Sequence, residues 1–302
     1  MASRRNLGAD FGLSLRMLFT MFLLLFLYSA FMWVLWQAGV GFSAIVIVVG
    51  VMLAIQYFYS DKLVLMSTRA KVVSPAEEPQ LHAVVERLAA MAGLPTPRIA
   101  VMDTDVPNAY ATGRSPRHAV VAVTRGLMQR LDWPEIEAVL AHELAHIKNR
   151  DMSVLTLASF FATVASVIMQ NFYYMSLYGR ARSRNDRNNQ GAAIVLVWLA
   201  SVAVYVISYF LIRALSRYRE YAADRGSAIL TGAPSQLMSA LTKISGVMSR
   251  IPETDLRQAQ GVNAFFIIPA IRGEALMELF STHPSLERRL AHLRKIEQEM
   301  RG

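Results

Sequence analysis

The longest uncharged stretch of the chain covers residues 17–60 and contains no histidine. A membrane-spanning helix needs about 20 apolar residues, so this stretch is too long for one span and fits two. Gly39 and Gly41 mark the place where a turn would divide it. A cleaved signal peptide fits poorly, because a second block of spanning length follows the first directly. We therefore expect residues 1–61 to form an N-terminal pair of transmembrane helices.

Two further uncharged stretches, residues 152–179 and 188–212, are each long enough to cross a bilayer. Either could instead be a buried core helix, but their length and their content of Val, Ile, Leu and Phe favour spans. They form a second transmembrane pair, residues 152–212. This pair divides the polar part of the chain into residues 62–151 and residues 213–302, which we expect to be two halves of one domain.

The two polar segments combine helical and strand patterns. Helical periodicity covers residues 78–92, 216–230, 234–250 and 284–300. Short runs rich in Val, Ile and Ala, which are typical of strands, cover residues 98–102, 106–113 and 119–123. The expected fold class is therefore a mainly α-helical, multi-span membrane protein with a small β-sheet.

The formal net charge is +9, from 31 basic and 22 acidic residues. Nucleic-acid binding is not expected, because no basic stripe interleaved with aromatic residues and no reader motif is present. Basic residues that flank the first two spans explain the excess better: Arg4, Arg5, Arg16, Lys62, Arg69 and Lys71. By the positive-inside rule, both termini and the polar segments are expected in the cytoplasm. Four arginines between the third and fourth spans oppose that rule: Arg180, Arg182, Arg184 and Arg187. Either the first two spans set the topology or the second pair does not cross fully, and we favour full crossing.

The most informative motif is His142-Glu143-Leu144-Ala145-His146. Two histidines four residues apart lie on one face of a helix, where both imidazoles can bind one Zn²⁺. The carboxylate of Glu143 can reach a water held on that metal and act as the general base. Asp132 is well placed to cap the helix. The chain has six histidines in 302 residues, so a chance match to this motif is improbable.

A catalytic zinc needs three protein ligands, and the absence of cysteine leaves His, Asp or Glu for the third. Glu220 and Asp224 lie four residues apart on one predicted helical face. We assign Glu220 as the third ligand of one zinc ion per chain. We assign Asp224 as the acceptor that fixes a zinc-bound imidazole through its far nitrogen. The alternative is that both acids pair with neighbouring arginines on a solvated helix face.

The spacing of these ligands also predicts where the metal lies. His146 precedes the second hydrophobic pair by a few residues, and Glu220 follows that pair at a similar spacing. At 1.5 Å per helical residue, both ligands lie roughly 7–11 Å from the ends of the pair. We therefore expect the zinc just above the cytoplasmic membrane surface, on helical extensions of the third and fourth spans.

The order of several motifs resembles the HtpX family of membrane-bound zinc metalloproteases, which are relatives of the CAAX prenyl endopeptidases. The motifs are His142-Glu143-x-x-His146, Glu220-x-x-x-Asp224, residues 108–113 and His283-Pro284. The resemblance implies a zincin-like domain in which both histidines and Glu220 bind zinc and Glu143 is the general base. It also implies a bacterial inner-membrane endopeptidase with a cytoplasmic active site, acting in the quality control of misfolded or damaged membrane proteins.

Two further residues are candidates for catalysis, because an oxyanion that forms on the scissile carbonyl needs a hydrogen-bond donor besides zinc. These are His283 and Arg289. For His283 the alternative is a capping role before Pro284. For Arg289 the alternative is a solvated charge or a structural ion pair.

Residues 108–113 could form an edge strand that aligns an extended substrate through main-chain hydrogen bonds. We therefore name Asn108, Ala109 and Tyr110 as candidate substrate-binding residues, with an ordinary core strand as the alternative. The expected partners are protein or peptide substrates and the lipid bilayer, and the sequence leaves the oligomeric state open.

The competing function is a metal-binding membrane scaffold or chaperone without turnover. Glu143 argues against it, because a structural zinc does not need that carboxylate. A transporter is the weaker alternative, since the predicted spans contain no charged residue or histidine.

Overall fold

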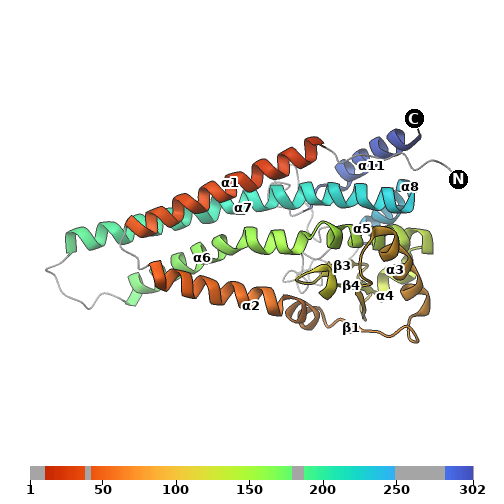
Figure 1. The fold of residues 1–302 in the computed structure, drawn as a ribbon, viewed down its shortest axis with the longest axis horizontal. Helices are drawn as coiled ribbons and strands as arrows, with labels where there is room; N and C mark the ends of the chain where they lie inside the picture. The colour runs from red at the N-terminus through yellow and green to blue at the C-terminus, as the bar shows by residue number, and fades with distance from the viewer. Residues whose placement is uncertain (1–10, 38–41, 179–186, 249–282, 302) are drawn as a thin grey trace.

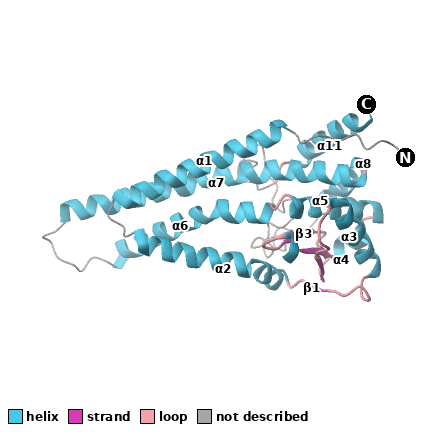
Figure 2. Cartoon of the chain, viewed as in Figure 1, coloured by secondary structure: helices cyan, strands magenta, loops and turns pink. Residues whose placement is uncertain are grey.

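Four long helices extend from one end of the molecule, and a small sheet with shorter helices forms the other end (Figure 1). The computed structural model describes residues 11–37, 42–178, 187–248 and 283–301. The long helices are α1 (Phe11–Gln37), α2 (Phe42–Thr68), α6 (Asp151–Tyr178) and α7 (Arg187–Thr231). Helices and a few strands account for most of the described chain (Figure 2), so the expected fold class is confirmed.

The compact end of the molecule contains the remaining elements. Its helices are α3 (Pro79–Ala92), α4 (Arg125–Arg130), α5 (Trp133–Lys148), α8 (Pro234–Met248) and α11 (Leu286–Arg301). Its strands are β1 (Lys71–Val72), β2 (Arg98–Met102), β3 (Ala109–Thr112) and β4 (Val120–Thr124). The helices and strands predicted within the described residues are present, whereas β1 and α4 were not expected. Residues 251–273, for which the sequence gives mixed signals, lie outside the described residues.

The strand order in the sheet is β1-β2-β4-β3. Strand β4 runs parallel to β2 and antiparallel to β3. Strand β3 therefore lies at an edge of the sheet, as residues 108–113 were expected to do.

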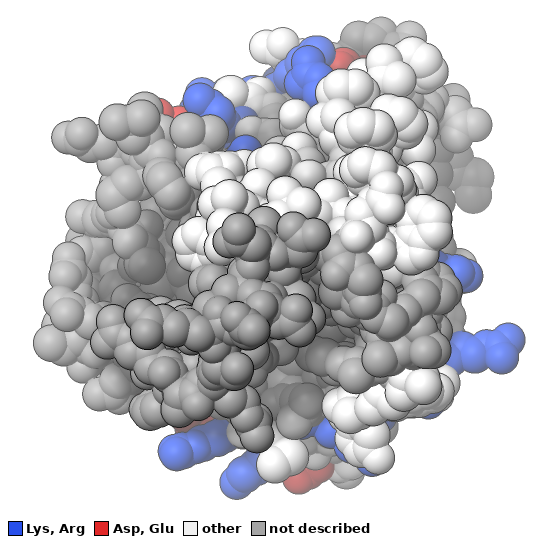
Figure 3. All heavy atoms as spheres, turned by 90° about the vertical axis from the view of Figure 1, so that its left-hand side faces the viewer, with Lys and Arg blue, Asp and Glu red and all other residues white. Residues whose placement is uncertain are grey.

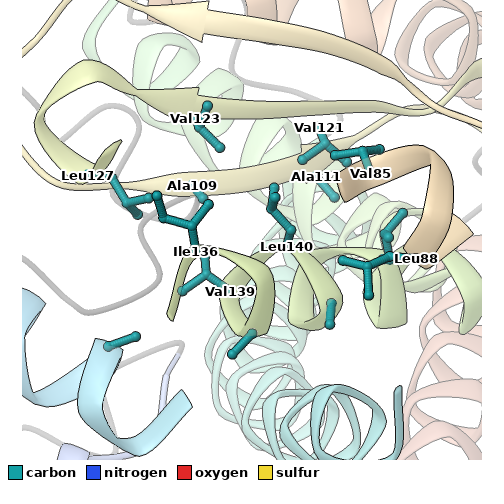
Figure 4. Close-up of a cluster of buried hydrophobic side chains, with 14 of the residues drawn as sticks. Val85, Leu88, Ala109, Ala111, Val121, Val123, Leu127, Ile136, Val139 and Leu140 are labelled. Carbon is teal, nitrogen blue, oxygen red and sulfur yellow. The ribbon is translucent and has the colours of Figure 1, made fainter. Parts of the chain in front are cut away.

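The two faces of the sheet pack against different parts of the chain. Alternate residues of a strand point to opposite faces. Val121 and Val123 of β4 point to α5, where they meet Ile136 and Leu140 (Figure 4). On the opposite face, Ala122 belongs to a second cluster, which packs against Val64 and Leu65 near the end of α2. A predicted membrane helix thus supports the sheet directly.

The long helices form their own apolar core. Leu24, Tyr28, Phe31 and Leu35 of α1 are buried against Ala158 and Ala165 of α6 and Val204 and Leu215 of α7. The Tyr28 hydroxyl donates a hydrogen bond of 2.5 Å to the carbonyl of Ala158. Other apolar side chains of α1 are exposed, among them Phe22 and Leu25. A helix that buries one side and exposes large apolar groups on another is suited to lipid contact.

Within the described residues, three helical segments are long and apolar enough to cross a membrane: Phe11–Gln37, Asp151–Gln170 and Val195–Thr231. Helix α2, several of whose side chains lie outside the described residues, occupies the place of the second predicted span. Seen from the left-hand side of Figure 1, the visible Lys and Arg side chains lie around the rim, and the described residues toward the centre are uncharged (Figure 3). The protein is therefore a membrane protein.

Candidate metal centre

The His-Glu-x-x-His motif lies on α5, close to its C-terminal end. Asp132 is the N-cap residue of this helix, and its backbone amide donates to the Glu135 carboxylate over 2.9 Å. The spacing of four residues brings the Nε2 atoms of His142 and His146 to 3.1 Å from each other. Both imidazoles therefore face one point in space.

A third group approaches the two imidazoles from α7. The Glu220 carboxylate lies 3.6 Å from His142 Nε2 through one oxygen and 3.6 Å from His146 Nε2 through the other. Ligand atoms of a tetrahedral zinc with bonds of about 2.0–2.1 Å are about 3.3 Å apart, so these spacings suit one ion. Two nitrogens and a carboxylate, without sulfur, are also a donor set typical of catalytic zinc. The three residues fit a divalent metal ion.

The ligand-bearing elements differ from the prediction in one respect. Glu220 lies on α7, which continues from the fourth predicted span without a break, as expected. The histidines do not lie on an extension of the third span, because α5 ends at Lys148 and α6 begins at Asp151. Arg150 between them has a φ of 56°, a left-handed conformation that ends a helix. The chain therefore changes direction between the motif and the span.

His142 is supported from behind by Asp224, the residue named for that role. Its Nδ1 atom lies 3.0 Å from Asp224 Oδ1, and both residues are buried. Burial lowers the pKa of His142, but the adjacent carboxylates of Asp224 and Glu220 outweigh burial and raise it to about 9. Because both acids are buried inside the domain, the alternative of a solvated helix face does not describe them.

His146 has a comparable support that the sequence did not reveal. Its Nδ1 atom and Asp151 Oδ2 form a hydrogen bond of 2.5 Å, and Arg219 Nε lies 2.8 Å from the other Asp151 oxygen. Burial and the charge of His142 lower the pKa of His146 to about 4. No role was predicted for Asp151 from the sequence, because on a continuous helix a residue five positions after His146 would not face it.

The Glu143 side chain is buried in the same region as the three candidate ligands. Burial raises its pKa, whereas the charges of His142 and His146 and a hydrogen bond from the Ala111 backbone amide lower it; burial prevails. The amide of an edge strand thus fixes the carboxylate that was expected to act as general base.

The other two catalytic candidates, His283 and Arg289, also reach this centre. His283 Nδ1 lies 3.2 Å from one Glu220 oxygen, and Arg289 Nη1 lies 3.3 Å from the other. Arg289 also binds Asp224 with two nitrogens, Nε at 3.0 Å and Nη2 at 2.6 Å. Arg289 is fully buried, so the alternative of a solvated charge is wrong and the ion pair is present.

Strand β3 contains or adjoins the three substrate-binding candidates. The Thr124 amide donates to the Asn108 carbonyl, and the Asn108 amide donates to Thr124 Oγ1, both over 2.9 Å. Bonding alternates along an antiparallel pair, so Asn108 and Tyr110 turn their main-chain groups to β4. Ala109 and Ala111 turn theirs away from β4, to the side of β3 on which the described residues place no further strand. Sequence reasoning missed Ala111, because this alternation depends on which residues pair.

The Tyr110 side chain and a nearby hollow complete the surroundings of β3. The Tyr110 hydroxyl lies 2.6 Å from the Thr68 hydroxyl near the end of α2. A small hollow lies beside His146 at the end of β3, and Gly113, Ile147 and Arg150 are among its lining residues.

A model of peptidase family M48 matches residues 75–297, which is most of the chain. The chain belongs to peptidase family M48. Together with the His142, His146 and Glu220 group, this makes it a metalloprotease. The M48 match covers strands β2 to β4, α5 and the ligand-bearing part of α7, so it includes every candidate site residue named above.

Relatives in the same family match nearly the whole chain. "Protease HtpX homolog" of Moorella thermoacetica is 65% identical over 298 residues, covering 98% of each chain. "Protease HtpX homolog 2" of Methanosarcina acetivorans is 56% identical over 297 residues, covering 98% of this chain and 99% of the relative. The resemblance to the HtpX family is therefore confirmed.

A solved structure shares the fold of this M48 chain. The crystal structure of S. mikatae Ste24p has a TM-score of 0.56 and 20% sequence identity, and it covers 88% of this chain. The chain spans 62% of the length of Ste24p, so that protein has additional sequence. At this level of identity the similarity concerns the arrangement of helices and strands alone.

Proposed function

We propose that this membrane metalloprotease is a zinc endopeptidase of the bacterial inner membrane that cleaves misfolded or damaged membrane proteins at the cytoplasmic face. The observation that carries the proposal is the triangle of His142, His146 and Glu220, with Glu143 adjacent on the same helix. Zinc is favoured because the site offers two imidazoles, one carboxylate and no thiolate. In this proposal residues 62–151 and 213–302 are the two halves of the catalytic domain.

Zinc held by the three ligands would supply the Lewis acidity that activates a water and polarises the scissile carbonyl. Glu143 accepts a proton from the attacking water and delivers it to the leaving nitrogen. Its hydrogen bond from the Ala111 amide holds the carboxylate in one orientation during both transfers. Asp224, 3.0 Å from His142 Nδ1, keeps the other imidazole nitrogen directed at the metal.

His283 and Arg289 have different roles in this proposal. His283 lies at the edge of the ligand triangle and donates a hydrogen bond to the developing oxyanion. Arg289 directs Nε and Nη2 at Asp224 and Nη1 at Glu220, so it acts through these carboxylates. Arg289 is therefore a positioning residue rather than an oxyanion donor.

The substrate pairs with the open edge of β3 in an extended conformation. Ala109 offers its main-chain N–H and C=O to the substrate and Ala111 its C=O, because the main-chain groups of Asn108 and Tyr110 face β4 and the Ala111 amide binds Glu143. A side chain of the substrate enters the hollow beside His146. Main-chain pairing is independent of sequence, which suits a protease that removes damaged proteins of many kinds.

The site lies close to where α6 and α7 leave the apolar part of the molecule. Asp151 is the first residue of α6, and Glu220 lies on α7 itself. Basic residues that flank the first two spans support a cytoplasmic position for this end of the molecule. Unfolded segments of membrane proteins that emerge at the cytoplasmic surface are therefore the proposed substrates.

The decisive experiment compares the full-length wild-type protein with Glu143→Gln on an unfolded membrane-protein substrate. We expect wild-type cleavage to stop with a chelator, to return when zinc is added, and to be absent in Glu143→Gln although the variant still binds zinc. Glu137→Gln, on the same helix, is the matched control and should cleave at the wild-type rate. If Glu143→Gln cleaves as fast as the wild type, the proposed mechanism is wrong, and if the zinc-loaded wild type only binds substrate, the protein is a scaffold.

A further inference from the structure

Each of the two imidazoles on α5 is backed by a buried aspartate and a buried arginine. Behind His142, Asp224 contacts the imidazole and Arg289 contacts Asp224. Behind His146, Asp151 contacts the imidazole and Arg219 contacts Asp151. The exposed fractions of Asp151 and Arg219 are both 2%. The array behind His146 is therefore as fully removed from solvent as the one behind His142.

We propose that Asp151 and Arg219 are positioning residues for the metal centre. Asp151 accepts a hydrogen bond from the Nδ1–H of His146, which leaves Nε2 as the nitrogen directed at Glu220 and the metal. Arg219 neutralises Asp151 through its second oxygen and holds it in place. This inference rests on the proposed zinc site and adds two residues to which sequence reasoning assigned no role.

The chain bends to create the contact between Asp151 and His146. Five residues along a continuous helix correspond to a rotation of about 500°, which would leave Asp151 about 140° away from the face of His146. The left-handed conformation of Arg150 (φ 56°) interrupts the helix and returns Asp151 to that face. A non-glycine residue kept in this sparsely populated region is a sign that the surrounding structure requires the bend.

The two residues of this array belong to the helices of the second predicted transmembrane pair. Asp151 begins α6, and Arg219 directly precedes Glu220 on α7. The contact therefore joins the start of one span to the helix that bears the third ligand. A buried Asp–Arg pair by itself is weak evidence for a stabilising role. Asp151 binds Arg219 through Oδ1 and the ligand His146 through Oδ2, and this second contact is what indicates that the pair positions the ligand.

The test measures zinc affinity of the full-length protein in detergent by competition with a chromophoric chelator. Asp151→Asn keeps the shape of the side chain and removes its charge, so we expect zinc affinity to fall about 10–100-fold. The absorption spectrum of the Co²⁺-loaded variant should also differ from that of the wild type. The metal-free variant should melt at a lower temperature, because Arg219 loses its buried partner, so the deciding readouts are zinc affinity and the Co²⁺ spectrum, which the loss of a purely structural pair would not change.

Arg219→Lys and Glu137→Gln complete the series. Arg219→Lys keeps the charge but loses the guanidinium geometry, so its affinity should lie between those of the wild type and Asp151→Asn. Glu137→Gln, which breaks the surface pair with Arg87 on the same helix, should bind zinc as the wild type does. If Asp151→Asn does not fold, the Arg219→Lys affinity and Co²⁺ spectrum decide the question by the same criteria.

Two results would overturn the inference, and they differ in what else they affect. Wild-type zinc affinity and Co²⁺ spectrum in Asp151→Asn, with a lower melting temperature of the metal-free protein, would make the pair purely structural and leave the proposed function intact. Failure of the wild-type protein itself to bind zinc would refute the proposed function together with this inference.

Discussion

Arg289 lies on α11, whose sequence is otherwise strongly polar, and occupies a position in its buried stripe together with Leu293 and Ile296. A guanidinium in that position is tolerated because the Asp224 and Glu220 carboxylates surround it. Burial lowers the pKa of Arg289, but these two negative charges outweigh it, so the pKa is raised and the group stays charged. The charge of Arg289 on α11 thus keeps the buried Asp224 and Glu220 of α7 in their ionised form.

Replacement of Arg289 by Ala should destabilise the protein strongly, because it leaves the Asp224 charge buried without its partner. Breaking a buried pair in this way costs about 3–5 kcal/mol. The matched control is Arg87→Ala, which removes an exposed bidentate pair with Glu137 that is worth about 0–1 kcal/mol. The measurement is the melting temperature of the metal-free protein in detergent. A large fall in kcat without a fall in melting temperature would instead make Arg289 an oxyanion donor.

Among the single elements, β3 uses the main-chain groups of alternate residues for different contacts: one set bonds to β4, and the other faces away from β4. Asn108 and Tyr110 hold the strand to β4, and the Ala111 amide binds Glu143. Proline removes one backbone N–H and is tolerated on edge strands. Proline at Ala109 or at Ala111, whose main-chain groups do not bond to β4, therefore tests what each backbone N–H does.

Ala109→Pro should raise KM about 2–10-fold with kcat nearly unchanged, because the substrate loses one main-chain hydrogen bond. Ala111→Pro should lower kcat instead, because Glu143 loses the amide that orients it. Steady-state kinetics on a peptide substrate separates the two effects, and melting temperatures verify that both variants fold. Equal changes in KM and kcat for the two variants would contradict the assignment of open-edge groups to substrate and general base.

The N-terminal end of α5 is joined to α8 by a charged contact. The Lys243 ammonium lies 2.8 Å from the Glu135 carboxylate, and Ser239 donates to the same carboxylate over 2.6 Å. Burial raises the pKa of Glu135, but hydrogen bonds from Lys243, Ser239 and the Asp132 amide together outweigh it, so the pKa is lowered. The folded protein therefore binds a proton at Glu135 less readily than the unfolded chain.

Because the folded pKa of Glu135 is below its unfolded value of about 4.3, its stabilising contribution is complete above that pH and is lost as pH falls through the folded pKa. Glu135→Gln should be less stable than the wild type at pH 6, and the difference should shrink toward pH 3. Melting temperatures are measured with a chelator present, so that loss of metal does not contribute. Glu86→Gln on the exposed side of α3 is the control, and a difference that is constant with pH would refute the prediction.

At the scale of the whole molecule, the apolar helices place the compact end on one side of a membrane. The chain contains no cysteine, so single cysteines can be introduced without background. Met66 is 75% exposed near the end of α2, beside the sheet, and Ala38 follows the last residue of α1. These two positions are expected on opposite sides of the bilayer.

We expect Met66→Cys to react with a membrane-impermeant maleimide only after the cell membrane is opened, and Ala38→Cys to react in intact cells. The reason is the positive-inside bias of the residues flanking α1 and α2. Labelling of Met66→Cys in intact cells would place the metal centre outside the cytoplasm. It would leave the metalloprotease assignment unaffected, since that assignment depends on the site rather than on its orientation.

Residues close together in the chain were enough to predict the local features of this protein. Charge-free stretches predict spans because lipid cannot solvate charges, and the motif spacing predicts that His142 and His146 share one helical face. Glu220 and Asp224 could be named because the absence of cysteine left few donors for the metal, and both lie at the site. Each of these inferences depends on residues close together in the chain.

The tertiary structure alone decided how distant residues meet around that helix. It paired Asp151 with Arg219 behind His146, placed the Ala111 amide on Glu143, and buried Arg289 against Asp224. The first contact depends on the left-handed conformation of Arg150, the second on the register of β3 against β4, and the third on the packing of α11. Periodicity cannot reveal them, because it describes which face of an element is apolar and not which partner that face meets.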